Sequence, residues 1–424
     1  MDDTIFALSS GAPPAAIAIV RVSGSRAGEI AEGLSGRKPE PRRAALARLR
    51  NREGETLDDA LILWFPGPDT ATGEDLLELH CHGGRAVVRA VEHALQHAWD
   101  CRPAEAGEFT RRAFANGRID LAQAEALGDL LSAESELQRR VAVRMAGGAA
   151  SARVEDWRER LLILAAQIEA ALDFSDEDDV ADLSPAFSAG VATLAAEIGE
   201  WLARPAAERL REGIRIALAG PPNSGKSSLF NRLLDEEAAI ATPIEGTTRD
   251  LLERPIAWGG VPFTLIDTAG LRDTTDDAIE AIGIERARSA LADADIVLWL
   301  GPKGEGPRGA WEIETKSDLD GPGKHAARHR VSAVNGEGVL GLQTDLVASA
   351  RDILPKPGET ALNARQRAAL MPAEDALLSI ENEGDHLLIA ENLRRARVAF
   401  DAFTGRAASE DVLDRLFGQF CIGK

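Results

Sequence analysis

The sequence is poor in cysteine, in aromatic residues and in long apolar runs, and these shortages exclude several classes of protein. Its three cysteines, Cys81, Cys101 and Cys421, are too few for a disulfide framework, and no two of them have metal-ligand spacing. The best apolar run near the N-terminus, residues 15–20, is too short to cross a bilayer, and no basic leader precedes it. We therefore expect a cytoplasmic protein in a reducing compartment, with no membrane span.

Positive charge is also scarce, because 69 acidic residues face 48 basic ones and the formal net charge is -21. A chain with this charge is repelled by polyanions, which argues against a simple nucleic-acid coat protein. The charge is unevenly spread, however. Residues 37–52 contain seven basic residues and one acid, whereas residues 173–182 contain six carboxylates that we interpret as a solvated loop between helices.

What the sequence does contain is enough apolar residues, 45% of 424, to build two to four domains with real cores. Residues 1–118 mix short β-rich runs, at 15–20, 60–65 and 76–80, with a helix after residue 84, and predict a small α+β domain. In the next segment apolar residues recur every three or four positions, which indicates amphipathic helices of a bundle. The third segment alternates strands and helices, and the last is helical again. We place the domains at 1–118, 119–209, 210–356 and 357–424, with the α/β domain inserted in a bundle built from both flanks.

The clearest motif is GPPNSGKS at residues 220–227, which matches the phosphate-binding pattern G-x-x-x-x-G-K-[ST] between a buried strand and a helix. Such a loop turns backbone N–H groups toward phosphates, while Lys226 adds charge at the β and γ oxygens and Ser227 reaches Mg²⁺. A glycine-rich turn with a chance lysine is the alternative, disfavoured because only seven of the basic residues are lysines. The nucleotide contacts expected from this motif are Asn223, Ser224, Gly225, Lys226, Ser227 and Ser228.

Three later elements indicate that the nucleotide is GTP. Asp267, Thr268, Ala269 and Gly270 end a second apolar strand, where Asp267 would hold the Mg²⁺ shell and the Gly270 amide would approach the γ-phosphate. One of the threonines at 247 and 248 would close over the metal. The segment Thr315, Lys316, Ser317, Asp318 resembles the guanine-reading N-K-x-D element, with Asp318 accepting from guanine N1 and N2 and with Thr315 in place of Asn. Ser332, Ala333 and Val334 would supply the last, backbone-mediated guanine contact.

Further motifs along the whole chain resemble one family. They are Asp3-Thr4-Ile5, IAIVRVSG at 17–24, TGED at 72–75, CHGG at 81–84, GEFT at 107–110, RAF at 112–114, DLAQAEA at 120–126 and FCIGK at 420–424. Together they resemble the tRNA uridine-5-carboxymethylaminomethyl modification GTPases, the MnmE/TrmE family. The resemblance implies an α+β N-terminal domain plus a helical bundle with an inserted α/β P-loop GTPase (G) domain.

The resemblance implies that the G domains of a homodimer meet around a K⁺ ion, which takes the place of an arginine finger. The matching K⁺ ligands are Asn223, Thr242, Ile244 and Thr247, and those for Mg²⁺ are Ser227 and Thr248. The implied water-orienting residue is Glu280, whose alternative role is an exposed carboxylate of the switch helix. The GTP contacts implied between the phosphate loop and the second strand are Thr242, Pro243, Ile244, Glu245, Gly246, Thr247 and Thr248.

The N-terminal domain of the family binds a tetrahydrofolate derivative, the 5-formyl or 5,10-methylene form. The matching folate-binding residues are Arg21, Glu78, Arg118 and Lys424. Cys421 is a candidate nucleophile, although a small apolar residue packed at the bundle end remains an equal interpretation. His80 and His82 have no third ligand nearby in sequence, so we expect a structural or folate-pocket role rather than a metal pair.

The function implied is a K⁺-dependent GTPase that works with a flavin-dependent subunit of the MnmG/GidA family, as a heterotetramer. Together they would convert C5 of the wobble uridine, position 34 of certain tRNAs, to carboxymethylaminomethyl or aminomethyl forms with a folate one-carbon unit. Two alternatives remain open: a GTP-controlled binding switch in ribosome or RNP assembly, and a folate enzyme regulated by GTP. The basic N-terminal segment on an acidic chain predicts weak, salt-sensitive tRNA affinity for this chain alone.

Overall fold

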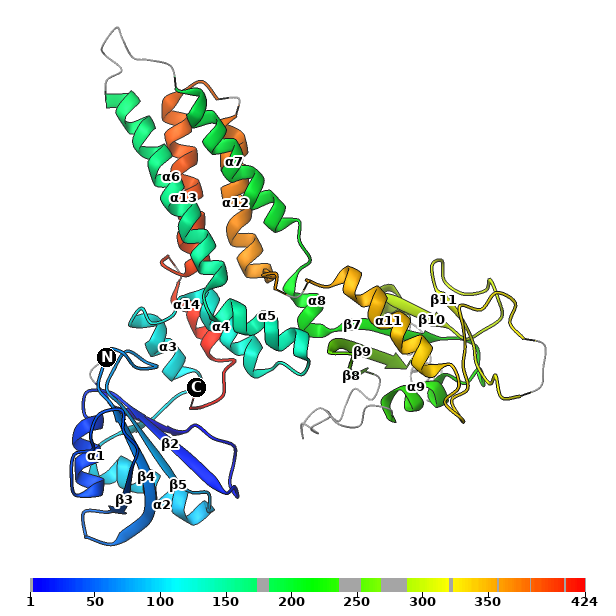
Figure 1. Cartoon of the computed structure of the whole chain (residues 1–424). Coiled ribbons are helices and arrows are strands. Elements are labelled where there is room, and N and C mark those ends of the chain that lie inside the picture. The colour runs from blue at the N-terminus through cyan, green and yellow to red at the C-terminus, as the bar shows by residue number, and fades with distance from the viewer. Residues whose placement is uncertain are drawn as a thin grey trace, which may run out of the picture. The chain divides into compact units, whose positions relative to one another are not determined.

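The computed structural model describes residues 3–173, 183–235, 253–267, 288–319, 323–356, 358–381, 383–407 and 409–423. The chain forms two compact units. The first consists of Met1–Gly128 with Asp401–Lys424, and the second of Asp129–Phe400. Figure 1 shows both termini in the first unit. No helix among the described residues is long and apolar enough to cross a membrane.

The first unit is built on a six-stranded sheet with the order β3-β4-β5-β2-β1-β6. Neighbouring strands are antiparallel except β1 and β6. The predicted strands are confirmed as β2, β4 and β5, and the predicted helix as α2 (Arg85–Ala98). The strands are β1 (Ile5–Leu8), β2 (Ile17–Ser23), β3 (Ala45–Arg50), β4 (Thr56–Phe65), β5 (Leu76–His82) and β6 (Arg102–Pro103).

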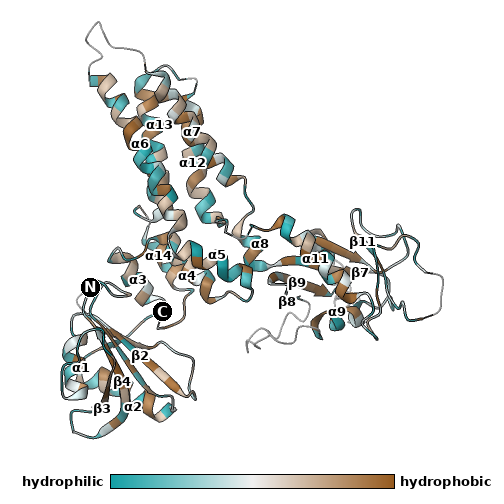
Figure 2. Ribbon diagram, viewed as in Figure 1, coloured by the Kyte–Doolittle hydropathy of each residue, from teal (hydrophilic) through white to brown (hydrophobic). Residues whose placement is uncertain are grey.

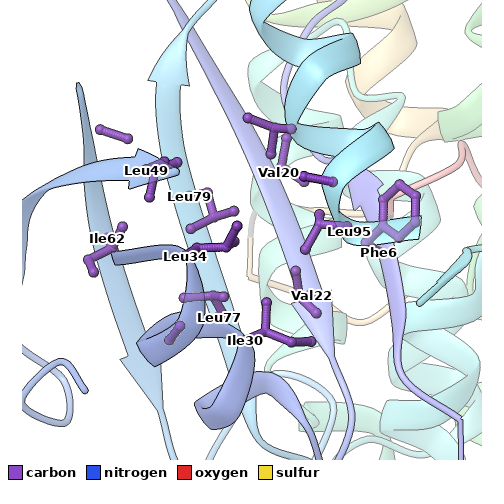
Figure 3. Close-up of a cluster of buried hydrophobic side chains, with 14 of the residues drawn as sticks. Phe6, Val20, Val22, Ile30, Leu34, Leu49, Ile62, Leu77, Leu79 and Leu95 are labelled. Atoms are coloured by element: carbon purple, nitrogen blue, oxygen red, sulfur yellow. The ribbon is translucent and has the colours of Figure 1, made fainter. Parts of the chain in front are cut away.

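Different helices pack on the two faces of this sheet. Alternate side chains of the strands, such as Val20 and Leu79, pack with α1 (Ala27–Ser35) and α2 into the main core, which Figure 3 shows. Near the β1 end, the opposite face carries a smaller apolar cluster around Phe109 of α3 (Glu108–Ala115). Because strand side chains alternate between faces, the polar residues that lie between these core positions fall on the α3 face.

The C-terminal segment completes the first unit. Helix α14 (Glu410–Phe417) packs against α3. Phe417 and Phe420 join Leu121 of α4 (Leu121–Leu131) in a third buried cluster. The last residues of the chain therefore lie in the same unit as the N-terminal sheet.

Long helices make up much of the second unit. Figure 1 shows α6 (Ala149–Asp173), α7 (Pro185–Leu202), α12 (Ala364–Ile380) and α13 (His386–Thr404) running side by side, and Figure 2 shows hydrophobic and hydrophilic residues mixed along these helices, as in an amphipathic bundle. Trp157 lies fully buried in their core. Its ring is T-shaped to that of Trp201, with centroids 5.3 Å apart, and tilted by 32° to that of Phe400, with centroids 6.2 Å apart. The helices of this unit outside its α/β part are α5 (Glu136–Ala146), α6 (Ala149–Asp173), α7 (Pro185–Leu202), α8 (Ala207–Glu212), α12 (Ala364–Ile380) and most of α13 (His386–Thr404).

The α/β part of the second unit has a sheet with the order β12-β11-β10-β7-β9-β8. Only β8 is antiparallel to its neighbour, so the carboxyl ends of the other five strands meet at one edge. The elements are β7 (Ile214–Ala219), α9 (Lys226–Asp235), β8 (Glu253–Trp258), β9 (Val261–Asp267), β10 (Ile296–Trp299), β11 (Trp311–Glu314), β12 (His329–Arg330) and α11 (Val339–Ile353).

The connection from β10 to β11 departs from the usual pattern. Parallel neighbours are normally joined through a helix, yet residues 300–310 contain none. Backbone of this loop passes so close to the Trp299 ring that a Cβ at Gly301 or Gly306 would lie about 2.5 Å from it. Lys324 reinforces the same region, because its Nζ donates to the carbonyls of Trp299 and Ile313 at 2.9 and 3.2 Å.

Candidate functional site

The predicted nucleotide-binding residues lie at the carboxyl edge of the parallel sheet. The phosphate loop follows β7, Asp267 ends β9, Thr315 follows β11, and Ser332 comes shortly after β12. Ligands of open α/β sheets bind outside this edge, because the connecting loops converge there. The topology therefore brings together motifs that are up to 112 positions apart in sequence, from Gly220 to Ser332.

The phosphate loop owes its shape to residues that tolerate positive φ. Gly220, Asn223 and Gly225 have φ of +155°, +61° and +90°. A side chain at Gly220 would also press on Ser224 Oγ and on the Gly301 backbone. The loop leads directly into α9, whose N-terminal N–H groups favour an anion.

Two residues at the start of α9 carry the charge and the metal chemistry expected of the loop. The Lys226 ammonium donates to the carbonyls of Gly220 and Pro221 at 3.0 and 2.9 Å, so it lies across the loop. The Ser227 hydroxyl donates to Asp267 Oδ2 at 3.1 Å. A hydroxyl and a carboxylate side by side are the oxygen ligands that Mg²⁺ prefers, so these residues fit the ion.

The guanine-reading segment is bonded to the phosphate loop. Thr315 Oγ1 donates to the Ser224 carbonyl at 2.7 Å, and Lys316 Nζ donates to the Asn223 carbonyl at 2.9 Å. Ser224 Oγ is buried, and among the described residues it has no hydrogen-bond partner. A buried hydroxyl of this kind requires a partner, and a phosphate oxygen fits.

The remaining residues predicted to contact guanine lie at the same edge of the sheet. Asp318, the predicted base-reading carboxylate, is exposed. Ser332 is fully buried, and its Oγ accepts from the N–H groups of Val334 and Asn335 at 3.3 Å each. This turn shapes the segment that also contains Ala333, while Val334 is 82% exposed. Several predicted site residues lie outside the described residues: Thr242, Pro243, Ile244, Glu245, Gly246, Thr247, Thr248, Thr268, Ala269, Gly270, Glu280 and Lys424.

A second polar site lies on the α3 face of the N-terminal sheet. Arg21 and Glu78 are opposite each other on β2 and β5, and Arg21 donates to Glu78 Oε1 at 2.8 Å. His80 Nε2 lies 3.1 Å from the other oxygen of Glu78. Burial alone would raise the pKa of Glu78, but hydrogen bonds with Arg21 and His80 outweigh it and hold that pKa below its ordinary value. The Phe109 ring lies 6.0 Å from the Arg21 guanidinium.

The C-terminal tail runs beside this sheet. Ser9, just after β1, donates to the Gly423 carbonyl at 2.9 Å, and Ile422 forms a bridge with Ala106. Gly423 has φ of +92° and packs on the Leu8 carbonyl. Cys421 is exposed, whereas burial raises the pKa of Cys81 to about 12 and that of Cys101 to about 11. Of the three thiols, Cys421 is therefore the one accessible to a substrate or reagent.

The other residues singled out by sequence have structural partners. Arg118 pairs with Asp69 at 3.0 Å rather than with the Arg21–Glu78 pair. His82 Nδ1 lies 2.8 Å from Asp58 Oδ1, and within the described ranges no group of three His, Cys, Asp or Glu residues could hold a metal.

Sequence reasoning missed Phe109, which lies inside the quoted GEFT motif, and the bond from Thr315 to Ser224. Phe109 could have been recognised from the GEFT motif. The hydrogen bond from Thr315 to Ser224 joins residues 91 positions apart, and nothing near either residue in the sequence indicates it.

Comparison with known proteins gives matches over nearly the whole chain. Residues 4–118 match a family model described as "GTP-binding protein TrmE N-terminus", and residues 121–421 match "MnmE helical domain". Proteins called tRNA modification GTPase MnmE are 64% identical in Erythrobacter litoralis and 56% identical in Novosphingobium aromaticivorans, covering 100% of both chains in each case. The one from Zymomonas mobilis is 49% identical over 99% of this chain and 100% of its own. Among solved structures, the G domain of the T. maritima FeoB iron transporter is 25% identical, with a TM-score of 0.23, over 32% of this chain and 98% of its own.

Proposed function

Because the chain belongs to the MnmE family of tRNA modification GTPases, we propose that its sheet edge binds GTP with Mg²⁺ and that K⁺ activates hydrolysis. We propose further that the chain acts as a homodimer with a flavin-dependent subunit, and that a folate one-carbon unit is added at C5 of the wobble uridine. The four-domain division at 1–118, 119–209, 210–356 and 357–424 is part of this proposal.

The observation that carries the proposal is the convergence of four motifs at one sheet edge. Lys226 lies across the phosphate loop, Ser227 touches Asp267, and Thr315 and Lys316 bond the guanine segment to that loop. When bound, Mg²⁺ would neutralise phosphate charge between Ser227 and Asp267. The task of Lys226 is then to exchange its carbonyl partners for phosphate oxygens, and the task of Asp318 is to accept the guanine donors.

Asn223 supports the K⁺ part of the proposal. It is exposed at the tip of the phosphate loop in a left-handed conformation, and the bond from Lys316 to its carbonyl holds that conformation. The exposed side-chain amide oxygen of Asn223 is a ligand that suits a weakly hydrated monovalent cation. We expect wild-type GTP hydrolysis to be much faster in KCl than in NaCl, and Asn223→Ala to remove the difference while GTP still binds. Equal rates in the two salts, or an unaffected Asn223→Ala, would count against this mechanism.

The Arg21–Glu78 pair supports the folate part. A guanidinium and a carboxylate side by side, next to an aromatic ring, can recognise a pteridine by hydrogen bonds and stacking. The described part of the C-terminal tail ends at Gly423, whose carbonyl accepts from the Ser9 hydroxyl just after β1.

The decisive experiment is nucleoside analysis of tRNA from cells that lack this chain. We expect the modified wobble uridines to disappear, and to return with the wild-type chain but not with Arg21→Ala. Unchanged wobble uridines in the deletion strain would instead favour the binding switch in RNP assembly.

A further inference from the structure

The first unit carries a cluster of exposed cations that the GTP and folate sites do not use. It comprises seven basic residues, all exposed, on the connection after α1, on edge strand β3 and just beyond that strand: Arg37, Lys38, Arg42, Arg43, Arg48, Arg50 and Arg52. We call these residues the basic rim. Its charge opposes the net charge of -21 that the whole chain carries.

Few of these cations are neutralised by the protein itself. Arg43 pairs with Glu40 at 2.8 Å, and Arg48 pairs with Asp59 at 2.8 Å. Arg50 donates to the Gly54 carbonyl and Arg42 to the Asp69 carbonyl, and neither forms an ion pair with a described carboxylate. Within the described part of the chain, five of the seven have no carboxylate partner.

Aromatic rings hold three of these five cations in place. Lys38 Nζ lies 4.4 Å from the Trp64 ring centroid, the Arg52 guanidinium 5.6 Å from that of Trp99, and the Arg42 guanidinium 5.9 Å from that of Phe65. A ring attracts the cation without satisfying its N–H donors, so those donors stay available to an external acceptor. Holding the side chains in advance also reduces the entropy lost on binding.

Helix α1 organises two of the supporting rings. Gly28 faces the Trp64 ring, with an ideal Cβ 3.1 Å from it, and a Cβ at Gly33 would overlap the Trp99 ring. The two glycines therefore let tryptophans pack on one helix, and each tryptophan carries one cation of the rim.

Protection of an edge strand is the other use for such residues, since charge discourages pairing with a second sheet. Only Arg48 and Arg50 lie within β3 (Ala45–Arg50), and the other five lie outside it. Acidic residues would protect an edge as well, and this chain has 69 of them. Protection of the β3 edge therefore does not explain why most residues of the basic rim lie outside β3. It also does not explain why the residues of the basic rim are all cations.

We propose that the basic rim binds the phosphate backbone of the RNA on which this GTPase acts. Guanidinium groups donate to phosphate oxygens in pairs, and the spread of cations around one helix and one strand suits a phosphate chain better than a single anion. This inference rests on the tRNA role of the family, and it assigns the contact to one surface.

The test uses the full chain and a transcribed tRNA with uridine at the wobble position, with affinity measured by fluorescence anisotropy at several salt concentrations. The variant R37Q/K38Q/R52Q is expected to bind about tenfold more weakly, and its plot of log affinity against log salt to be shallower by about 2 to 3. The charge-preserving variant R37K/K38R/R52K should bind like wild type. The control K303Q/R308Q/R351Q, which removes three exposed cations from the second unit, should also bind like wild type.

GTP hydrolysis and the thermal unfolding temperature show whether each variant is folded, and both should stay unchanged. Arg37→Glu alone changes an exposed residue and should weaken binding about threefold, so the test does not depend on the triple variant. Unchanged binding by R37Q/K38Q/R52Q, or an equal loss in the control variant, would overturn the assignment of the surface. Absence of tRNA binding by the wild-type chain would overturn the assignment together with the function on which it rests.

Discussion

At the scale of single residues, Thr315 shows how a substitution within a motif is compensated. The guanine-reading element usually begins with Asn, and the sequence alone suggests that Thr315 loses an amide contact. In the structure its hydroxyl donates to the Ser224 carbonyl at 2.7 Å, so it ties the guanine segment to the phosphate loop. One hydroxyl therefore links the two loops that are predicted to form the nucleotide site.

This bond can be tested with Thr315→Val, which keeps the shape and removes the donor. Loss of one hydrogen bond of about 1 kcal/mol predicts an affinity for GTP lower by about fivefold. Thr315→Ser keeps the hydroxyl and is the matched control. Titration with a fluorescent guanine nucleotide gives both values, and equal affinities for the Val and Ser variants would show that the bond contributes nothing to binding.

At the scale of secondary-structure elements, the α/β part of the second unit has a loop where a crossover helix is usual. Between β10 and β11, glycine backbone packs on Trp299, and Lys324 donates to two strand carbonyls. Its Nζ also lies 2.6 Å from Glu312 Oε2. Burial would raise the pKa of Glu312, but Lys324 and the Gly304 N–H hold it below the ordinary value. The Lys324 ammonium, whose side chain is 10% exposed, thus links the end of β10 to β11 where no helix covers the connection.

We therefore expect Lys324→Met to destabilise the protein strongly, because it leaves a partly buried carboxylate and two carbonyls without their donor. The expected loss in the free energy of unfolding is about 2–4 kcal/mol. Lys303→Met is the control, since Lys303 is exposed, and it should change that free energy by less than about 0.5 kcal/mol. Urea unfolding followed by circular dichroism measures both. Equal stabilities would mean that the Lys324 contacts do not support the loop.

At the scale of the whole molecule, acidic residues dominate the charge, yet many of those described are held by arginines. Arg112, 1% exposed, binds Asp3, Glu74 and Glu108. Burial would raise the pKa of Glu108, but bonds from Arg102, the Glu105 N–H and Arg112 hold it below its ordinary value of 4.5. Such a carboxyl stabilises the fold at pH above about 4.5, and this contribution is lost as the pH falls through the lowered pKa.

This network predicts a pH-dependent effect of Arg112→Met. At pH 7 the variant leaves the largely buried Glu74 carboxylate without a cation and Glu108 with Arg102 alone, and it should lose about 3–5 kcal/mol of unfolding free energy. The loss should shrink between about pH 5 and pH 3, because protonation removes the unpaired charge. Comparing wild type and variant at each pH cancels the changing repulsion of the net charge. Arg48→Met, at an exposed pair, should show a small loss at every pH, and an Arg112→Met loss that stays constant from pH 7 to pH 3 would contradict the prediction.

Much of the fold was predictable from local pattern. The spacing of apolar residues predicted β2, β4, β5 and a helical bundle. Apolar residues alternate along a strand and recur every three or four positions along a helix, so either pattern can be recognised within a short stretch of sequence. The phosphate loop was equally visible, because its glycines, Lys226 and Ser227 are contiguous. The helix-free crossover at 300–310 was not predicted, although the stretch is short and rich in glycine and proline, and its packing was not predicted either. Nothing local indicates that Lys324 reaches back to the carbonyl of Trp299.

The sequence by itself determined the family of this protein, through motifs spread along the chain, and it predicted a phosphate loop and a guanine-reading carboxylate. Only the tertiary structure decided which side chains meet. It paired Arg21 with Glu78, buried Arg112, and brought Gly423 to Ser9 across 414 positions. The physical reason is that the residues of a motif are close together in sequence and can be recognised there. A buried ion pair or a docked tail joins residues that are far apart in sequence, so it depends on the packing of the whole chain.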